Sequence, residues 1–116
     1  MRIDHVQLAM PAGGEAQADS FYRDVLGFFV VPKPPALLHR GGRWYEKEGV
    51  ALHLGVDSAF RASDKAHICL VVENFDEIIA TATHAGFATL FDTALEGVTR
   101  CYLRDPFGNR IELQQL

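Results

Sequence analysis

Apolar and polar residues along the first half of the chain follow two periods, one typical of strands and one of a helix. Residues 2–10 alternate as in a strand, and residues 15–26 carry apolar side chains at positions 18, 21, 22, 25 and 26, the stripe of an amphipathic helix. Gly27 is expected just past the helix end. Residues 28–32, 43–47 and 50–56 are predicted to be three further strands.

The second half repeats this order. A strand is predicted at 66–73, a helix at 75–85 and strands at 88–92, 98–104 and 109–115. Asn74 followed by Glu77 matches a capping box, so the Asn74 side chain is expected to cap the helix, which ends before Gly86.

The two halves also align residue by residue. His67 lies 62 positions after His5 (67 − 5), and residues 108–113 follow residues 49–54 at an offset of 59 (108 − 49). Such a period predicts two tandem βαβββ modules, at about 1–57 and 65–116, within one domain that spans residues 1–116. The expected class is α+β, a cupped mixed sheet with the helices on its outer face.

Four residues with good metal-binding side chains lie at matching places in these modules: His5, His53, His67 and Glu112. Because successive strand residues face opposite ways, each lies opposite its apolar neighbours and is expected on the sheet face away from the helix. A lone strand histidine is more often a hydrogen-bonded structural residue. Four such polar residues on symmetric strands favour a metal site, since imidazole and carboxylate are standard metal ligands.

The composition of the chain limits the kinds of partner and the cellular location that can be expected for it. With 48% hydrophobic and 22% charged residues, a net charge of −4 and interspersed charges, the chain shows no footprint for nucleic acid or membrane partners. No apolar run approaches a membrane span and no signal-peptide core begins the chain, so the cytoplasm is the expected location. Cys69 and Cys101 are expected to be buried, reduced thiols.

Two motifs carry a resemblance to a known family. Residues 21–28 (FYRDVLGF) and 105–113 (DPFGNRIEL) resemble those of the vicinal oxygen chelate superfamily, which includes glyoxalase I, extradiol dioxygenases, fosfomycin-resistance enzymes and bleomycin-binding proteins. The resemblance covers essentially the whole chain. It implies paired βαβββ modules, a divalent metal held on the first and last strands of the modules, and a homodimer.

Carried over residue by residue, the resemblance assigns three ligands: His5 on the first strand, His67 at the equivalent place in the second module, and Glu112 on the final strand. His53 stands where glyoxalase I has a glutamate, which makes the site about one charge more positive and favours an anionic ligand or a metal-bound hydroxide. The expected ion is zinc, iron, nickel or cobalt. The chain lacks some longer loops with which glyoxalase I surrounds its thiol conjugate, so glutathione is not assigned as a substrate.

The function expected from these residues is a glyoxalase-like isomerase or lyase, in which a small substrate with adjacent oxygen atoms chelates the metal and Glu112 transfers a proton. Gln7 and Arg110 lie on the same strand faces and are weaker candidates for substrate contacts. Two alternatives stay open. One is an iron-dependent extradiol-type dioxygenase that uses the same ligands, and the other is a metal-free binding protein for a small molecule or antibiotic.

Overall fold

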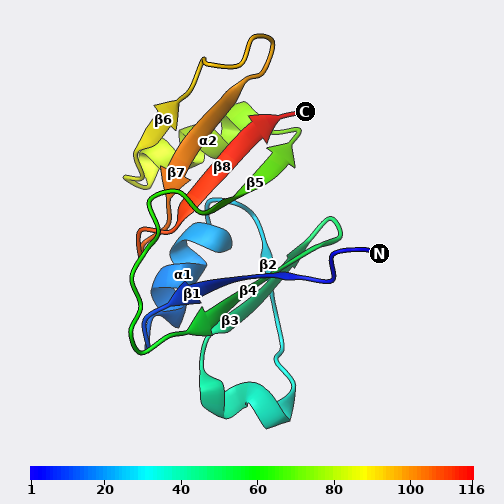
Figure 1. The fold of residues 1–116 in the computed structure, drawn as a ribbon, viewed down its shortest axis with the longest axis vertical. Helices are drawn as coiled ribbons and strands as arrows, with labels where there is room; N and C mark the ends of the chain where they lie inside the picture. The colour runs from blue at the N-terminus through cyan, green and yellow to red at the C-terminus, as the bar shows by residue number, and fades with distance from the viewer. The chain divides into compact units, whose positions relative to one another are not determined.

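The computed structural model describes residues 1–116 as two compact units, Met1–Arg61 and Ala62–Leu116 (Figure 1). Each unit holds one α-helix and one four-stranded sheet. No helix has the length and apolar character needed to cross a membrane.

The first unit follows the predicted order of strand, helix and three strands, with one short 3-10 helix added. Its elements are β1 (Val6–Met10), α1 (Glu15–Tyr22), β2 (Phe29–Val31), the 3-10 helix η1 (Pro35–Arg40), β3 (Arg43–Lys47) and β4 (Val50–Val56). The sheet order is β1-β4-β3-β2, with β1 parallel to β4 and the other pairs antiparallel. The central strand β4 therefore lies between β1 and β3.

The second unit has the same topology. It consists of β5 (His67–Val72), α2 (Phe75–His84), β6 (Thr89–Phe91), β7 (Arg100–Arg104) and β8 (Arg110–Gln115), in the sheet order β5-β8-β7-β6. Again the first and last strands pair in parallel, and β8 occupies the central position that β4 has in the first unit. The α+β class and the tandem βαβββ modules predicted from the sequence are thus confirmed, as two four-stranded sheets.

Several local predictions were wrong in detail. Asn74 is the N-cap residue of α2, but its side chain makes no capping hydrogen bond. The first helix ends at Tyr22, and residues 23–26 continue as turns whose amides still bond to carbonyls near the helix end. His5 precedes β1 by one residue. Cys69 is exposed rather than buried, because it lies on the sheet face away from α2; Cys101 is buried as expected.

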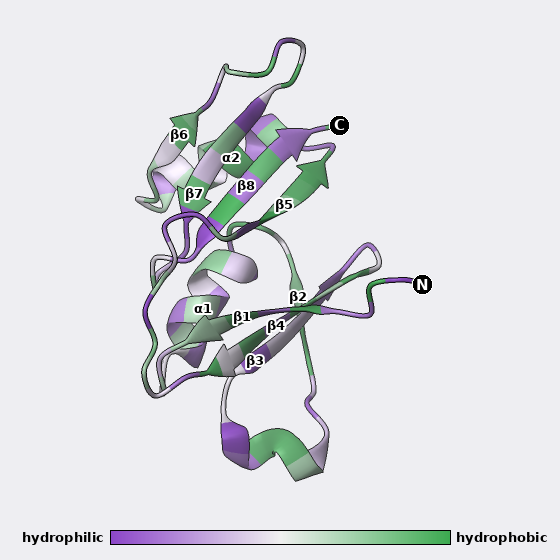
Figure 2. Ribbon diagram, in the orientation of Figure 1, coloured by the Kyte–Doolittle hydropathy of each residue, from purple (hydrophilic) through white to green (hydrophobic).

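The helix stripes and the alternate strand positions form the core of each unit. The buried apolar residues include all five stripe positions of the first helix region and Leu52, Leu54, Ile111 and Leu113 from the central strands. Alternating green and purple segments along β8 in Figure 2 show the same two-residue period. The opposite face of each sheet is thereby left to polar side chains.

One buried carboxylate ties α1 to its sheet. Asp19 accepts hydrogen bonds from the guanidinium of Arg43 at 3.0 and 2.8 Å and from the hydroxyl of Tyr45 at 2.7 Å, both on β3. Burial, followed by the hydrogen bond to Asp19, raises the pKa of Tyr45 well above its ordinary value, so this hydroxyl stays a donor. This contact holds β3 in place against α1. Because β3 pairs with β4, it also helps to fix the position of β4, which carries His53 of the candidate site.

Candidate metal centre

In the first unit the two candidate histidines form a stack with a tryptophan. Trp44 on β3 is the register partner of His53 on β4, so both side chains stand on the same sheet face. Their ring centroids are 4.0 Å apart with planes 2° from parallel, and His5 covers the other side of His53 at 4.3 Å. The imidazole of His53 is held between two rings and is only 8% exposed as a residue.

This stack sets the protonation state of His53. Burial lowers the pKa of His53 below its ordinary value, and electrostatic repulsion from the neighbouring His5 ring lowers it further. A neutral imidazole carries a free lone pair on one nitrogen, which is the form that binds metals. His5 is more accessible, with its side chain 43% exposed and its Nδ1 2.9 Å from Oδ2 of Asp4.

In the second unit the other two candidates are in direct contact. Nε2 of His67 lies 2.9 Å from Oε2 of Glu112, and the other oxygen of Glu112 accepts a hydrogen bond from Arg100 at 3.2 Å. Arg100 also pairs with Asp92 at 2.7 Å. The carboxylate side chain is only 7% exposed, so its contacts hold it in one position.

Both ring nitrogens of His67 face oxygen atoms. Nδ1 lies 2.8 Å from the backbone carbonyl of Lys65, which can only accept a hydrogen bond, so Nδ1 carries a proton. In a neutral ring Nε2 is then a bare lone pair pointing at Oε2 of Glu112. Two lone pairs 2.9 Å apart repel unless a cation, either a proton or a metal ion, lies between them. A backbone carbonyl on Nδ1 is also the usual partner that aims Nε2 of a metal-ligating histidine.

The spacing of these donor atoms suits a metal. Two ligand atoms about 2.0 to 2.1 Å from one ion at an angle of about 90° to 110° are roughly 2.8 to 3.4 Å apart, and the Nε2–Oε2 separation of 2.9 Å falls in that range. The four candidate residues thus form one contacting pair within each unit, His5 with His53 and His67 with Glu112. No group of three or more histidine, cysteine, aspartate and glutamate side chains in the chain is placed to hold a metal ion.

The two weaker candidates lie on the expected faces. Gln7 is the register partner of His53 across the β1–β4 pair. Arg110, two residues before Glu112 on β8, places its guanidinium 3.8 Å from the ring centroid of Tyr102 and donates to the carbonyl of Asp64 at 3.1 Å. These contacts fix Arg110 close to the His67 ring, because Tyr102 also meets that ring edge-on at 5.6 Å.

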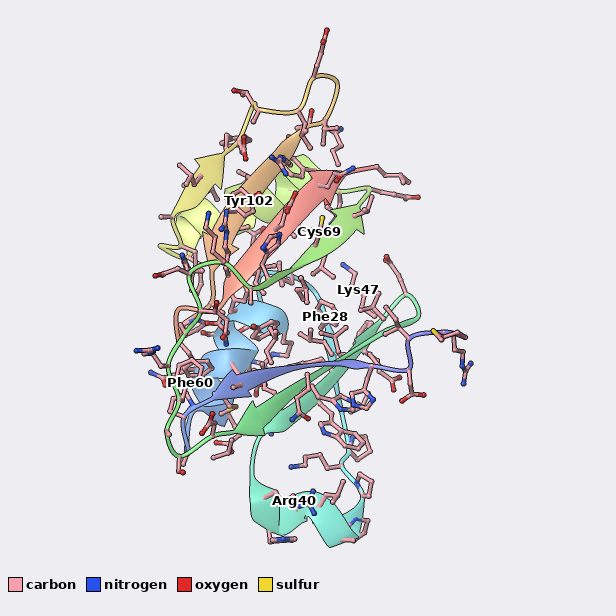
Figure 3. All side chains as sticks on the ribbon, in the orientation of Figure 1. Phe28, Arg40, Lys47, Phe60, Cys69 and Tyr102 are labelled. Atoms are coloured by element: carbon pink, nitrogen blue, oxygen red, sulfur yellow. The ribbon has the colours of Figure 1, made fainter.

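Sequence reasoning missed four residues around the ligand pairs: Trp44, Cys69, Arg100 and Tyr102. Cys69 and Tyr102 are the two register partners of Glu112, one on each neighbouring strand (Figure 3). The strand period could have placed all four on the ligand face, since each alternates with residues on the opposite face. Only the register, which the sequence does not give, shows that they neighbour the ligands.

Comparison of the chain with known protein families gives a match. The model of the Glyoxalase/Bleomycin resistance protein/Dioxygenase superfamily matches residues 2–113. The chain belongs to this superfamily. The resemblance carried by residues 21–28 and 105–113 is thus confirmed. Among proteins with curated functions, no match to the chain is found.

Solved structures of the superfamily share the whole fold. A glyoxalase family protein from Bacillus anthracis is 38% identical, with a TM-score of 0.94 over 99% of this chain and 94% of that chain. The fold is also similar to that of lactoylglutathione lyase from Agrobacterium tumefaciens, which is 22% identical with a TM-score of 0.69 over 95% of this chain and 91% of that chain. It is similar as well to that of the fosfomycin resistance protein FosX from Listeria monocytogenes, which is 12% identical with a TM-score of 0.78 over 100% of this chain and 93% of that chain. Members of the superfamily thus include enzymes with different reactions on one scaffold, and the reaction follows from the site.

Proposed function

We propose that the protein is a metal-dependent, glyoxalase-like isomerase or lyase that acts on a small substrate with vicinal oxygens. The ligands would be His5, His53, His67 and Glu112, so that each unit provides one pair. Three imidazoles and one carboxylate suit zinc, iron, nickel or cobalt better than magnesium or calcium.

The contact between His67 and Glu112 carries this proposal. It requires a cation between Nε2 and Oε2, and the hydrogen bond from Nδ1 to the Lys65 carbonyl keeps the ring in the orientation of a ligand. A neutral structural histidine would have one donor and one acceptor as its partners. Here both partners are acceptors, which favours a metal or proton site over a structural one.

The reaction follows from the second unit. A bound metal ion supplies a Lewis acid at which two neighbouring substrate oxygens can coordinate. Glu112 would act as a ligand in the resting site and as a base in the reaction. Through Oε2 it would remove the proton from the hydroxyl-bearing carbon beside the polarised carbonyl and return it to the carbonyl carbon, while the hydroxyl proton passes to the carbonyl oxygen, so that no proton is gained or lost. Arg100 holds Oε1, which leaves Oε2 as the oxygen available for both roles.

The two other function classes are separated by one set of measurements. An isomerase or lyase should convert an α-oxo substrate without consuming oxygen and should lose activity after chelation. A dioxygenase would instead cleave catechols with ferrous iron and consume oxygen, using His5, His67 and Glu112. Unchanged affinity for a bound small molecule after chelation, with no turnover of either substrate, would mean that the protein is a binding module.

We also propose a homodimer. Four strands, β1, β2, β5 and β6, have an unpaired edge in the sheets, and Phe29, Val30, Leu90 and Phe91 on β2 and β6 are exposed apolar residues. Open edges with apolar side chains are commonly covered by a second copy. Sedimentation equilibrium at micromolar concentration should give twice the 12.9 kDa chain mass; a single species at the chain mass would contradict this proposal.

A further inference from the structure

A second feature of the first unit lies next to the His5–His53 pair. A pocket of about 260 Å³ opens on the β1, β3 and β4 strands and on η1, with Trp44 in its wall. Its other lining residues are Gln7, Lys33, Leu37, Arg40, Gly41, Leu54, Gly55 and Val56. Two of them are cations and none is acidic, although the whole chain carries a net charge of −4.

The polar groups of the pocket are placed by the local fold. The side chain of Gln7 lies over Gly55. A Cβ atom at position 55 would be 2.5 Å from the side-chain amide nitrogen of Gln7, so the glycine leaves room for the Gln7 side chain. Lys33 donates a hydrogen bond to the carbonyl of Gly41 at the start of the pocket. This contact draws the ammonium group toward the rim formed by the end of η1.

Arg40, the last residue of η1 (Figure 3), is the second cation in the lining of this pocket. It is exposed and has no carboxylate partner. Glu15 lies beside this rim, and its Oε1 accepts the amide hydrogen of Gly42 at 2.9 Å. A guanidinium, an ammonium and an amide therefore surround one small pocket with no internal anion to neutralise them. Such a set of donors fits a carboxylate or phosphate group.

The pocket is joined to the candidate metal ligands through one side chain. The ring of Trp44 lines the pocket and also stacks on His53 with centroids 4.0 Å apart. A small molecule that reaches from the pocket past Trp44 would arrive at His53 and His5. Lys33, Arg40 and Gln7 would then hold one end of the molecule, and the histidines would face the other end.

We infer that this pocket binds the anionic group of the substrate, a carboxylate or a phosphate, so that the substrate is an anion whose vicinal oxygens lie at the other end of the molecule. This inference rests on the proposed function, since it assigns the substrate class of that site. Arg40 and Lys33 are the residues that determine specificity for the anion.

The test uses the metal-free protein and its own fluorescence. Trp44 is the only tryptophan of the chain, so its emission reports on the pocket. Inorganic phosphate and, separately, malonate are titrated at fixed pH and at an ionic strength held constant with sodium chloride. We expect a saturable change in Trp44 emission with at least one of them and none with chloride alone. Saturation by phosphate only would indicate a phosphorylated substrate, and saturation by malonate only a carboxylate.

Variants decide which residues bind the anion. Arg40→Gln and Lys33→Gln should each weaken binding at least about tenfold, the scale of one charge-assisted hydrogen bond. Arg40→Lys should retain most of it. Arg61→Gln removes the same charge from an exposed position outside the pocket and should bind as the wild type does. Circular dichroism checks that each variant folds.

Two results would overturn the inference: no saturable change with either anion, or equal affinity in wild type, Arg40→Gln and Lys33→Gln. Because no metal is present in this titration, a negative result would not contradict the proposed metal centre. Conversely, loss of metal binding in a ligand variant leaves anion binding unchanged if the pocket acts as inferred.

Discussion

Glu112→Gln is expected to lower turnover of an α-oxo or vicinal-oxygen substrate by at least about a hundredfold, the usual scale for removing a general base. The substitution keeps the size of the side chain and one acceptor oxygen but removes its charge and basicity. Arg100 retains its ion pair with Asp92 at 2.7 Å, so no guanidinium is left buried without a partner. The metal-free variant should therefore fold and melt close to the wild type.

The comparison must be made at matched metal occupancy, because Glu112 is also proposed as a ligand. Glu73→Gln, at an exposed position just after β5, is the matched control and should leave turnover unchanged. If Glu112→Gln with a full complement of metal turned over at the wild-type rate, Glu112 would be at most a ligand and the proton would be carried by another group.

His67→Ala is expected to abolish stoichiometric metal binding. Wild-type protein purified without an affinity tag should hold one divalent transition metal per set of four ligands. The alanine variant should lose at least about a hundredfold in affinity, since changing even an outer partner of a metal ligand costs tenfold to a hundredfold. It also leaves the buried oxygen Oε2 of Glu112 without its nitrogen partner. Elemental analysis after dialysis measures the occupancy.

The control for this variant is His84→Ala, which removes an imidazole from the exposed C-terminal end of α2. It should bind metal as the wild type does. Equal occupancy in His67→Ala and wild type would exclude His67 as a ligand, and the His67–Glu112 contact would then be a protonated structural pair.

Periodicity alone predicted the elements of both modules, because the helix stripe and the strand alternation are local properties of the chain. The predicted strands 43–47 and 50–56 coincide with β3 and β4. Predictions at element ends were less accurate. Asn74 does not cap α2 with its side chain, and His5 lies just outside β1, since end residues depend on contacts that local pattern does not specify.

The sequence also placed His53 and Glu112 on the faces opposite their apolar neighbours, which the strand period fixes. It did not show that both would be buried. His53 is covered by Trp44 and His5, and Glu112 is held by His67 and Arg100. These neighbours come from other segments of the chain, so only the pairing of the strands brings them together.

Register and side-chain direction are decided by the tertiary structure, because they depend on which residues of distant segments face each other. The contact of Nδ1 of His67 with the Lys65 carbonyl, which gives the ring its ligand orientation, has no signature in the sequence. The same is true of the pocket in which Lys33 and Arg40 meet Gln7 beside Trp44. The sequence by itself determined the family, the repeated modules and the candidate ligands. The tertiary structure decided how those ligands pair and which cations lie beside them, since the shared face of a sheet is formed only when the strands align.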